Sequence, residues 1–315
     1  MRIKLPCKQY RLARISCLIL ALALITFSAI SLADADRALF WAIEKDGEPA
    51  GYLLGTIHSE DPRVLEFSQD FLRKLSNNQI FAMEIVPDQL TLVRLIEYMH
   101  YPPGQTLESV IGSERFSALV AALSGYKVPT DFITRMKPWA AVVTLSTPPP
   151  ETGFFMDLSL SLRASGNGLK VVGLETLEQQ LSFLEDMPMS MQLNLLDQAI
   201  AESGRVREAH DQMVDAYLEN NLLRLQALSD DEFQAIGTDE RDYFFEAGIL
   251  ARNHRMLESL LPHLENNSVF VAVGALHLPG EDGLLDLLRQ NGYVLKPLDT
   301  PFIDDWTTSS PTSLY

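Results

Sequence analysis

Short apolar runs alternate along this chain with longer stretches in which apolar residues recur at helical spacing. The apolar runs are rich in residues that favour buried strands, and they cover residues 39–43, 52–58, 80–85, 169–175, 269–277 and 293–298. Helical spacing covers residues 62–75, 88–145, 156–164, 176–261 and 279–290. Strands that alternate with helices of this length predict an α/β fold with a central mixed, largely parallel sheet covered by many helices.

The first two strands are predicted to form a hairpin, because Asp46-Gly47 lies between them and favours a tight turn. We expect a single domain over residues 36–303. The helical stretches 88–145 and 176–261 should cover the sheet within that domain.

Two of the predicted strands end in the same motif, Gly-x-x-His. The first runs from Tyr52 to His58 and the second from Val269 to His277, with Gly55 or Gly274 three residues before the histidine. This repetition suggests that the two strands are neighbours and that the fold brings the two imidazole rings together.

Two further strands end close to an acid, Glu84 or Glu175. Ligands of open parallel sheets bind beyond the carboxyl ends of the strands. Two imidazoles and one or two carboxylates at that edge suit zinc, manganese, iron or cobalt. The alternative is that the acids cap the helices that follow, and it is stronger for Glu175, because a helical pattern begins at Thr176.

The composition is that of a globular protein, with 47% apolar and 21% charged residues. The formal net charge of −17 argues against nucleic acid and against anionic membrane surfaces as partners. It indicates an acidic, soluble surface.

Residues 1–35 are predicted to be a signal peptide. A basic start precedes an apolar run over 15–32, and Ala33-Asp34-Ala35 offers a cleavage site. The mature protein would then be periplasmic or secreted, without stable membrane insertion, although the run is long enough for an uncleaved anchor. Both cysteines, Cys7 and Cys17, fall in this segment, so a cysteine nucleophile and a zinc–thiolate site in the mature chain are excluded. Residues 304–315 are predicted to be a flexible tail.

The motif residues resemble the TraB/GumN family, which includes the TIKI proteins, and most closely its exported, GumN-like bacterial branch. The resemblance spans roughly residues 38–298. It rests on these segments: Gly55–His58, Glu84, Lys137-Pro138-Trp139, Met156-Asp157, Gly173–Thr176 with Gln179, Arg252-Asn253, Gly274–Leu278 and Gly283–Leu285. It implies a fold similar to that of erythromycin esterase and the ChaN-like lipoproteins. For the TIKI branch it implies metal-dependent proteolysis.

The strand-end residues and the resemblance together predict an exported metal-dependent hydrolase that cleaves a peptide or protein substrate. A divalent metal (Mn, Co or Zn) would be held by His58, Glu84 and His277. Glu175, or Glu84 if it is not a ligand, would act as general base. Arg252 would stabilise the oxyanion. The alternatives are a non-enzymatic haem or iron binder and an assembly factor for envelope polysaccharide.

Overall fold

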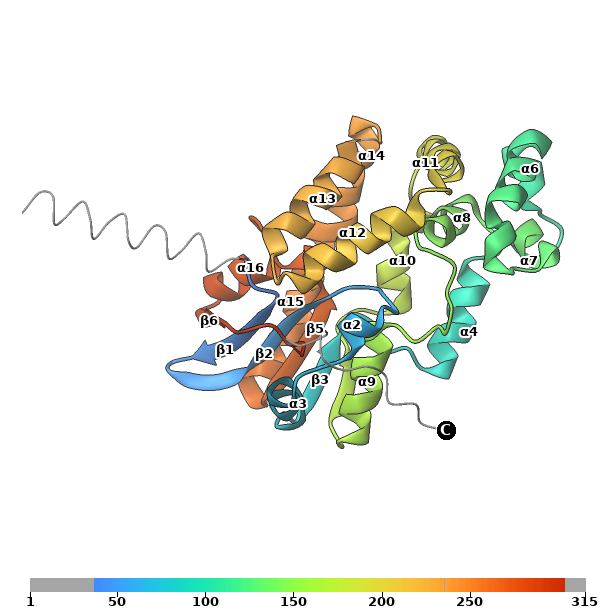
Figure 1. Cartoon of the computed structure of the whole chain (residues 1–315). Coiled ribbons are helices and arrows are strands. Elements are labelled where there is room, and N and C mark those ends of the chain that lie inside the picture. Colours follow the sequence, from blue (N-terminus) through green and yellow to red (C-terminus); the bar gives the residue numbers. More distant parts are fainter. Residues whose placement is uncertain (1–36, 235, 304–315) are drawn as a thin grey trace, which may run out of the picture. The chain divides into compact units, whose positions relative to one another are not determined.

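The structure is a computed structural model that describes residues 37–234 and 236–303 (Figure 1). The predicted signal peptide at 1–35 and the predicted tail at 304–315 lie outside the described residues. The described residues from Ala38 to Ile303 belong to one compact unit. Within the described ranges, no helix combines the length and the apolar character needed to cross a membrane.

A six-stranded sheet with the order β4-β3-β5-β2-β1-β6 lies at the centre. Four adjacent strands, β4, β3, β5 and β2, run parallel to one another. β1 pairs antiparallel with β2, and β6 pairs antiparallel with β1 at the edge. The predicted α/β fold with a mixed, largely parallel sheet is therefore confirmed. The strands are β1 (Phe40–Lys45), β2 (Glu48–Thr56), β3 (Ile80–Met83), β4 (Lys170–Gly173), β5 (Val269–Gly274) and β6 (Tyr293–Pro297).

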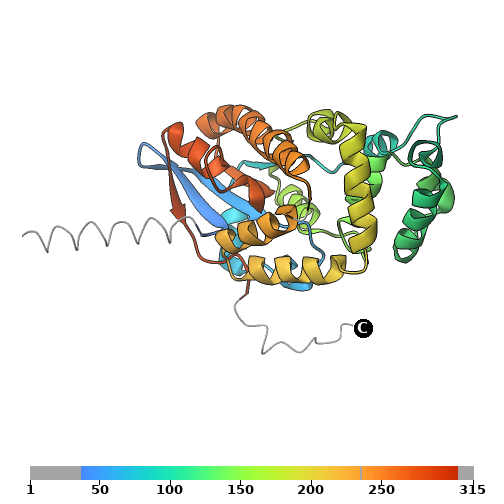
Figure 2. The ribbon, with the colours of Figure 1, turned by 90° about the horizontal axis from the view of Figure 1, so that it is seen from above.

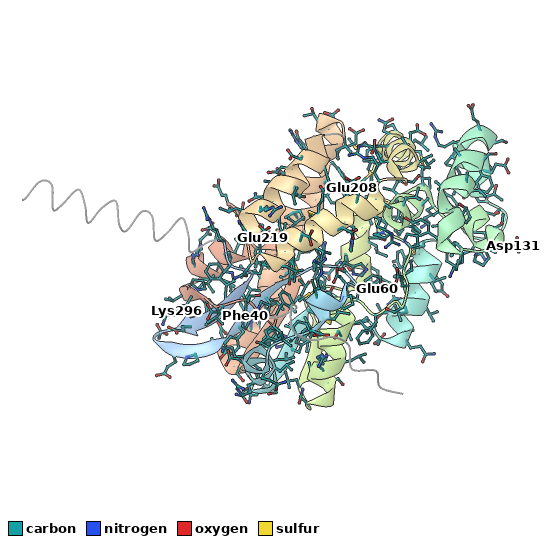
Figure 3. All side chains as sticks on the ribbon, viewed as in Figure 1. Phe40, Glu60, Asp131, Glu208, Glu219 and Lys296 are labelled. Atoms are coloured by element: carbon teal, nitrogen blue, oxygen red, sulfur yellow. The ribbon has the colours of Figure 1, made fainter. Side chains whose placement is uncertain are left out.

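The predicted hairpin joins β1 to β2. Its turn residues Asp46 and Gly47 have φ values of 54° and 84°, as a two-residue turn of type I′ requires. On the other side of β1, the edge strand β6 carries Lys296 (Figure 3), which forms an ion pair with Glu44 of β1 at 2.6 Å. A charged edge of this kind discourages pairing with a further strand.

Successive side chains of β1 point to opposite faces of the sheet. The Phe40 ring packs edge-on against Phe71 of α3 (Gln69–Ser76), with centroids 5.2 Å apart. Trp41 lies under the guanidinium of Arg289 in α16 (Leu284–Gln290). One face is covered by α3, α2 (Pro62–Leu65) and α9 (Met156–Gly166), and the other by α16 and α15 (Ala251–Asn266) (Figure 2).

The helices that follow β3 and β4 build a second hydrophobic cluster away from the sheet. They are α4 (Gln89–Tyr98), α5 (Leu107–Ile111), α6 (Ser113–Ala122), η1 (Leu123–Tyr126), α7 (Thr130–Arg135), α8 (Pro138–Leu145), α10 (Leu177–Glu185) and α11 (Met189–Glu202). Buried residues of this cluster include Leu119, Trp139 and Leu196. The expectation that residues 88–145 would cover the sheet is therefore corrected, and so is that for the first part of 176–261, because α10 and α11 belong to this second cluster.

Two later helices return to the sheet's core, α12 (Val206–Leu218) through Tyr217 and α13 (Leu222–Gln234) through Leu222. They are followed by α14 (Thr238–Tyr243), the π-helix η2 (Phe244–Leu250) and α15.

Two predicted helices have different bounds in the structure. The stretch 62–75 is broken, because Phe67 forms a bridge with Phe302 and Ser68 caps α3 by accepting from the Phe71 N–H. The helix expected at 279–290 begins only at Leu284, because Gly280 and Asp282 have φ values of 87° and 61°, which a right-handed helix excludes.

Candidate functional site

The four parallel strands end at the same edge of the sheet, and the predicted residues follow these ends. β2 ends at Thr56, β3 at Met83, β4 at Gly173 and β5 at Gly274. The two Gly-x-x-His strands, β2 and β5, are paired neighbours, as predicted. His277 lies in the short 3₁₀ turn η3 (Ala275–His277) that follows β5.

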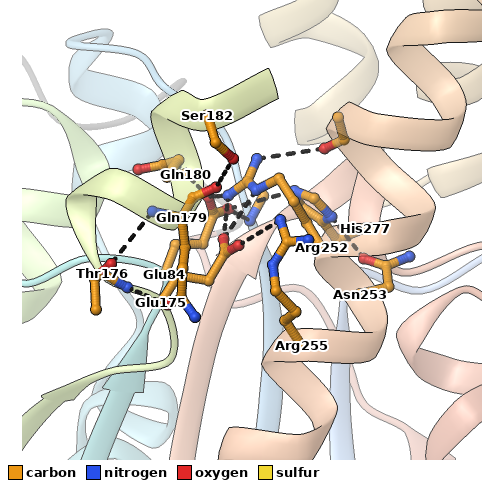
Figure 4. Close-up of polar contacts among 12 residues, drawn as sticks. Glu84, Glu175, Thr176, Gln179, Gln180, Ser182, Arg252, Asn253, Arg255 and His277 are labelled. Atoms are coloured by element: carbon orange, nitrogen blue, oxygen red, sulfur yellow. Dashed lines mark hydrogen bonds and ion pairs between the residues drawn. The ribbon is translucent and has the colours of Figure 1, made fainter. Parts of the chain in front are cut away.

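Glu84 lies at the centre of a network of polar contacts at this edge of the sheet (Figure 4). Its Oε1 accepts the Gly274 backbone N–H at 2.8 Å. Its Oε2 accepts from Arg252 Nη2 at 2.6 Å and from Gln180 Nε2 at 2.9 Å. Burial by itself raises the pKa of Glu84, but the charge of Arg252 and the hydrogen bonds from Gly274 and Arg252 hold the pKa below its usual value. Glu84 is therefore a carboxylate at neutral pH.

Arg252 joins Glu84 to Glu175. Its Nε and Nη2 both donate to Glu175 Oε2, at 2.8 and 2.7 Å, and Arg255 Nη2 lies 3.4 Å from Glu175 Oε1. The Glu175 side chain is fully buried. The guanidinium groups of Arg252 and Arg255 compensate for the free energy of burying its negative charge. Burial lowers the pKa of Arg252, but the two carboxylates more than compensate, so its pKa is raised and it stays charged.

Glu175 does not cap the following helix. Thr176 is the cap of α10, with a reciprocal pair of hydrogen bonds to Gln179. Likewise, Asp88 rather than Glu84 caps α4. Both acids are therefore free for the network, and the capping alternative is wrong for both.

The π-helix η2 immediately precedes Arg252. Its wider turn packs Gly248 against Phe183, and Arg252 Nη1 approaches the Gly248 carbonyl oxygen at 3.5 Å. Such π turns are rare and often occur at functional sites, where they re-aim side chains.

His277 is held by Asn253, the neighbour of Arg252. Its Nδ1 lies 2.6 Å from Asn253 Oδ1, and Asn253 Nδ2 donates to the Asp282 carbonyl oxygen at 2.8 Å. Because an amide oxygen only accepts, Nδ1 carries the hydrogen and Nε2 presents its lone pair, 3.8 Å from Glu84 Oε1. Burial lowers the pKa of His277 to about 4, so the ring is neutral at physiological pH.

His58 has different neighbours. Its side chain is 61% exposed and stacks on Phe155, with ring centroids 3.9 Å apart. Its Nδ1 lies 3.9 Å from Asp157 Oδ2, and Asp157 Oδ1 accepts from Thr56 Oγ1. Among the described residues, no hydrogen bond or ion pair links His58 to Glu84 or His277.

The site fits a metal in part. Glu84 Oε1 and His277 Nε2 are two suitable donors, and the Asn253 contact is the kind of second partner that orients metal-binding histidines. Across residues 37–234 and 236–303, however, no three His, Cys, Asp or Glu side chains are grouped closely enough to share a metal ion. The predicted set of His58, Glu84 and His277 stays a prediction.

A further carboxylate, Glu60 (labelled in Figure 3), holds the loop that contains Phe155. It accepts the backbone N–H of Thr152 at 2.6 Å and that of Gly153 at 3.1 Å. Burial raises the pKa of Glu60, but the hydrogen bond from the Thr152 hydroxyl and those from the backbone N–H groups together outweigh it and lower the pKa. The loop that supports His58 is thus tied to the end of β2.

Asn253, Gln180 and Arg255 belong to the network, but the sequence analysis gave them no role. One signal was available: α15 inserts Met256, Leu257 and Leu260 into the core, yet it begins with polar side chains at 252–255. Polar residues at the start of a buried helix need partners, which points to a site.

Comparison with known proteins shows distant relatives. Metalloprotease TIKI2 of Danio rerio is 23% identical over 88% of this chain and 64% of its own length. Metalloprotease TIKI2 of Xenopus tropicalis is 25% identical over 89% of this chain and 66% of its own length. The chain thus spans just under two thirds of these relatives. No solved structure matches it significantly.

The model of the TraB/PrgY/gumN family matches residues 39–297, nearly all of the described unit and all of the network above. The chain belongs to the TraB/PrgY/gumN family.

Proposed function

We propose that this protein is a metal-dependent hydrolase that cleaves peptide bonds. The observation that carries the proposal is the approach of two metal-donor atoms, His277 Nε2 and Glu84 Oε1, to 3.8 Å at the carboxyl ends of four parallel strands. The family and the name of the distant TIKI relatives favour this reading over binding without turnover.

In this proposal Glu84 and His277 would hold the metal, with His58 as the predicted third ligand. A bound divalent metal supplies Lewis acidity, which polarises the amide carbonyl and activates water. In the reaction, water adds its hydroxyl group to the carbonyl carbon, the C–N bond breaks, and a proton passes to the leaving amine.

Arg252 is proposed to stabilise the oxyanion that forms at the carbonyl. Of its five N–H groups, contacts with Glu84, Glu175 and Gly248 occupy four, so one N–H on Nη1 has no partner among the described residues. A fixed positive charge in a buried site stabilises developing negative charge strongly.

The contacts favour a positioning role for Glu175. Its carboxylate faces two arginines and its side chain is fully buried, so it holds Arg252 in place. Glu84, 21% exposed, is the carboxylate nearer to solvent. The general-base role predicted for Glu175 would therefore fall to Glu84 only if Glu84 does not bind the metal.

Metal analysis and peptide hydrolysis test the proposal together. The purified protein is assayed with Mn²⁺, Co²⁺ or Zn²⁺, beside His277→Ala, Glu84→Gln and the control His254→Ala. His254 lies on the same part of α15 but is 55% exposed. We expect bound metal and cleavage in the wild type and the control, and the loss of both in the two site variants. Absence of cleavage with all three metals, or metal content unchanged by both site variants, would overturn the proposal.

Export by the predicted signal peptide is part of the proposal. Mass spectrometry of the protein recovered from the producing cells would show a mature start near Asp36. An intact Met1 region would favour the anchor instead.

A further inference from the structure

The contacts of Glu84 within the described part of the chain leave one acceptor position of its carboxylate open. A carboxylate offers about four such positions, two on each oxygen. Oε2 accepts from Arg252 Nη2 at 2.6 Å and from Gln180 Nε2 at 2.9 Å, and Oε1 accepts the Gly274 N–H at 2.8 Å. The remaining position therefore belongs to Oε1, the oxygen that lies 3.8 Å from His277 Nε2.

The three donors differ in what they do to Glu84. The Gly274 N–H belongs to the backbone and is fixed at the end of β5. Arg252 carries a positive charge and is itself held by two hydrogen bonds to Glu175. Gln180 is uncharged, and because a carboxylate only accepts, the amide must turn its NH₂ group toward Oε2. Gln180 therefore restrains the rotation of the carboxylate without neutralising its charge.

Helix α10 holds the backbone of Gln180 in place, and Figure 4 shows the side chain reaching from this helix toward Glu84. The first turn of α10 is capped, and its last residue, Glu185, accepts from Lys137 Nζ at 2.7 Å and from Trp139 Nε1 at 2.8 Å. These contacts with the start of α8 anchor the far end of α10. A side chain on a helix that is fixed at both ends can hold its partner in one orientation.

We propose that Gln180 is a positioning residue that sets the rotation of the Glu84 carboxylate, so that Glu84 would bind the metal through Oε1 alone. The inference rests on the proposed metal-dependent hydrolysis and adds the donor atom and the side chain that selects it. Without the Gln180 contact, one hydrogen bond to each oxygen remains, and the carboxylate is free to tilt about its Cγ–Cδ bond. Losing a partner that orients a metal ligand lowers metal affinity about 10–100-fold.

The test compares Gln180→Leu with Gln179→Leu. Leucine is similar to glutamine in helix propensity, so Gln180→Leu removes the donor and preserves α10. Gln179 is the adjacent, exposed glutamine, and its hydrogen bonds in the described part of the chain serve the cap of α10 and do not reach Glu84. Each purified protein is titrated with Mn²⁺ by calorimetry, and urea unfolding gives its midpoint concentration.

We expect Gln180→Leu to weaken Mn²⁺ binding about 10–100-fold, while its urea midpoint falls no further than that of Gln179→Leu. Gln179→Leu should keep the wild-type affinity for Mn²⁺, although the loss of the cap lowers its urea midpoint. Equal Mn²⁺ affinity in Gln180→Leu and the wild type, or an equal loss of affinity in both variants, would overturn the positioning role and leave the hydrolase proposal standing.

Crystal structures of the metal-free proteins separate the two proposals, because they show the torsion angle of the Glu84 carboxylate and need neither bound metal nor cleavage. A carboxylate that turns in Gln180→Leu but not in Gln179→Leu supports the positioning role. That result would stand even if the wild type bound none of Mn²⁺, Co²⁺ and Zn²⁺ and the hydrolase proposal failed. The same torsion angle in all three proteins would overturn the role of Gln180.

Discussion

Asn253 shows how one uncharged residue can order a site. It is fully buried, accepts from His277 Nδ1 and donates to the Asp282 carbonyl oxygen. Asn253 thereby selects the tautomer of His277 in which Nδ1 carries the hydrogen and the Nε2 that faces Glu84 carries the lone pair.

Substitution Asn253→Ala should leave both buried partners unsatisfied. We expect the free energy of unfolding to fall by about 1–3 kcal/mol in urea titrations, and metal affinity to fall about 10–100-fold under the proposed function. Asn253→Asp keeps an acceptor for Nδ1–H, so it should retain more of the metal affinity. An Asn253→Ala protein as stable as the wild type would contradict the assignment.

The buried, neutral His277 makes stability depend on pH. Its pKa is about 4 in the folded protein and 6.5 when unperturbed. Between these values the unfolded state binds a proton that the folded state does not, so the free energy of unfolding falls as the pH drops from about 6.5 to 4. The full loss is about 3 kcal/mol. Glu84, whose pKa is lowered from 4.5, adds to the loss only below about pH 4.5.

Urea unfolding of the chelator-treated protein at about pH 7, 6 and 5 measures how the free energy of unfolding changes with pH. These pH values lie above the range in which carboxylates such as Glu84 take up protons. His277→Gln should remove the histidine contribution and flatten the pH dependence in that window. Equal slopes for the two proteins would show that His277 is not the group responsible.

At the scale of elements, the glycine of each Gly-x-x-His motif permits a close approach. A Cβ on Gly55 would lie 2.9 Å from Ala275 Cα and 3.0 Å from Leu278 Cδ2, so β2 and η3 touch through this position. A Cβ on Gly274 would lie 3.2 Å from Glu84 Oε1. The motif is thus a packing requirement as well as a source of histidines.

Substitution Gly55→Ala should force η3 away from β2, because one of the contacts is with backbone. We expect a loss of about 1–3 kcal/mol in the free energy of unfolding. The control is Gly166→Ala at the end of α9, where an added Cβ meets nothing within 4 Å and should be neutral or stabilising. Equal stability of the two variants would contradict the close approach.

The Glu60 contact predicts that the loop before α9 can be loosened without unfolding the sheet. Glu60→Ala should speed amide exchange at Thr152 and Gly153 about fivefold, since each lost hydrogen bond is worth about 1 kcal/mol. Glu151→Ala is the matched control, because the Glu151 side chain is 78% exposed in the same loop and lies 3.8 Å from Arg207. Unchanged exchange in Glu60→Ala would refute the fastening role.

At the scale of the whole described unit, the presence of two hydrophobic clusters predicts two levels of stability. The sheet and its covering helices form one cluster, and α4 to α8, α10 and α11 contribute to the other. Regions with separate cores often open separately.

We expect Leu119→Ala to cost about 2–5 kcal/mol in the second cluster, because Leu119 is fully buried there. Hydrogen exchange should quicken in α5 to α8 and stay unchanged in β2, β3 and β5. Leu54→Ala, equally buried in the first cluster, should quicken exchange throughout. A uniform response to Leu119→Ala would mean that the two clusters unfold as one.

Local chemistry in the sequence determined the strands and the hairpin. Runs of β-branched and aromatic residues form strands in most environments that bury them, and Asp46-Gly47 favours a type I′ turn. The order of the motifs also placed Glu84, Glu175 and His277 at strand ends, because parallel strands joined by helices end at one edge. That much follows from periodicity and connection geometry.

Only the tertiary structure decided which partners these residues meet. Glu175 pairs with Arg252, 77 residues away, and His277 with Asn253, whereas His58 stacks on Phe155. The helices of 88–145 pack around their own cluster because their apolar faces match α10 and α11, which periodicity cannot reveal. Periodicity shows that a face is buried, but long-range packing selects what lies against it, and that choice sets the charge and hydrogen bonding of the site.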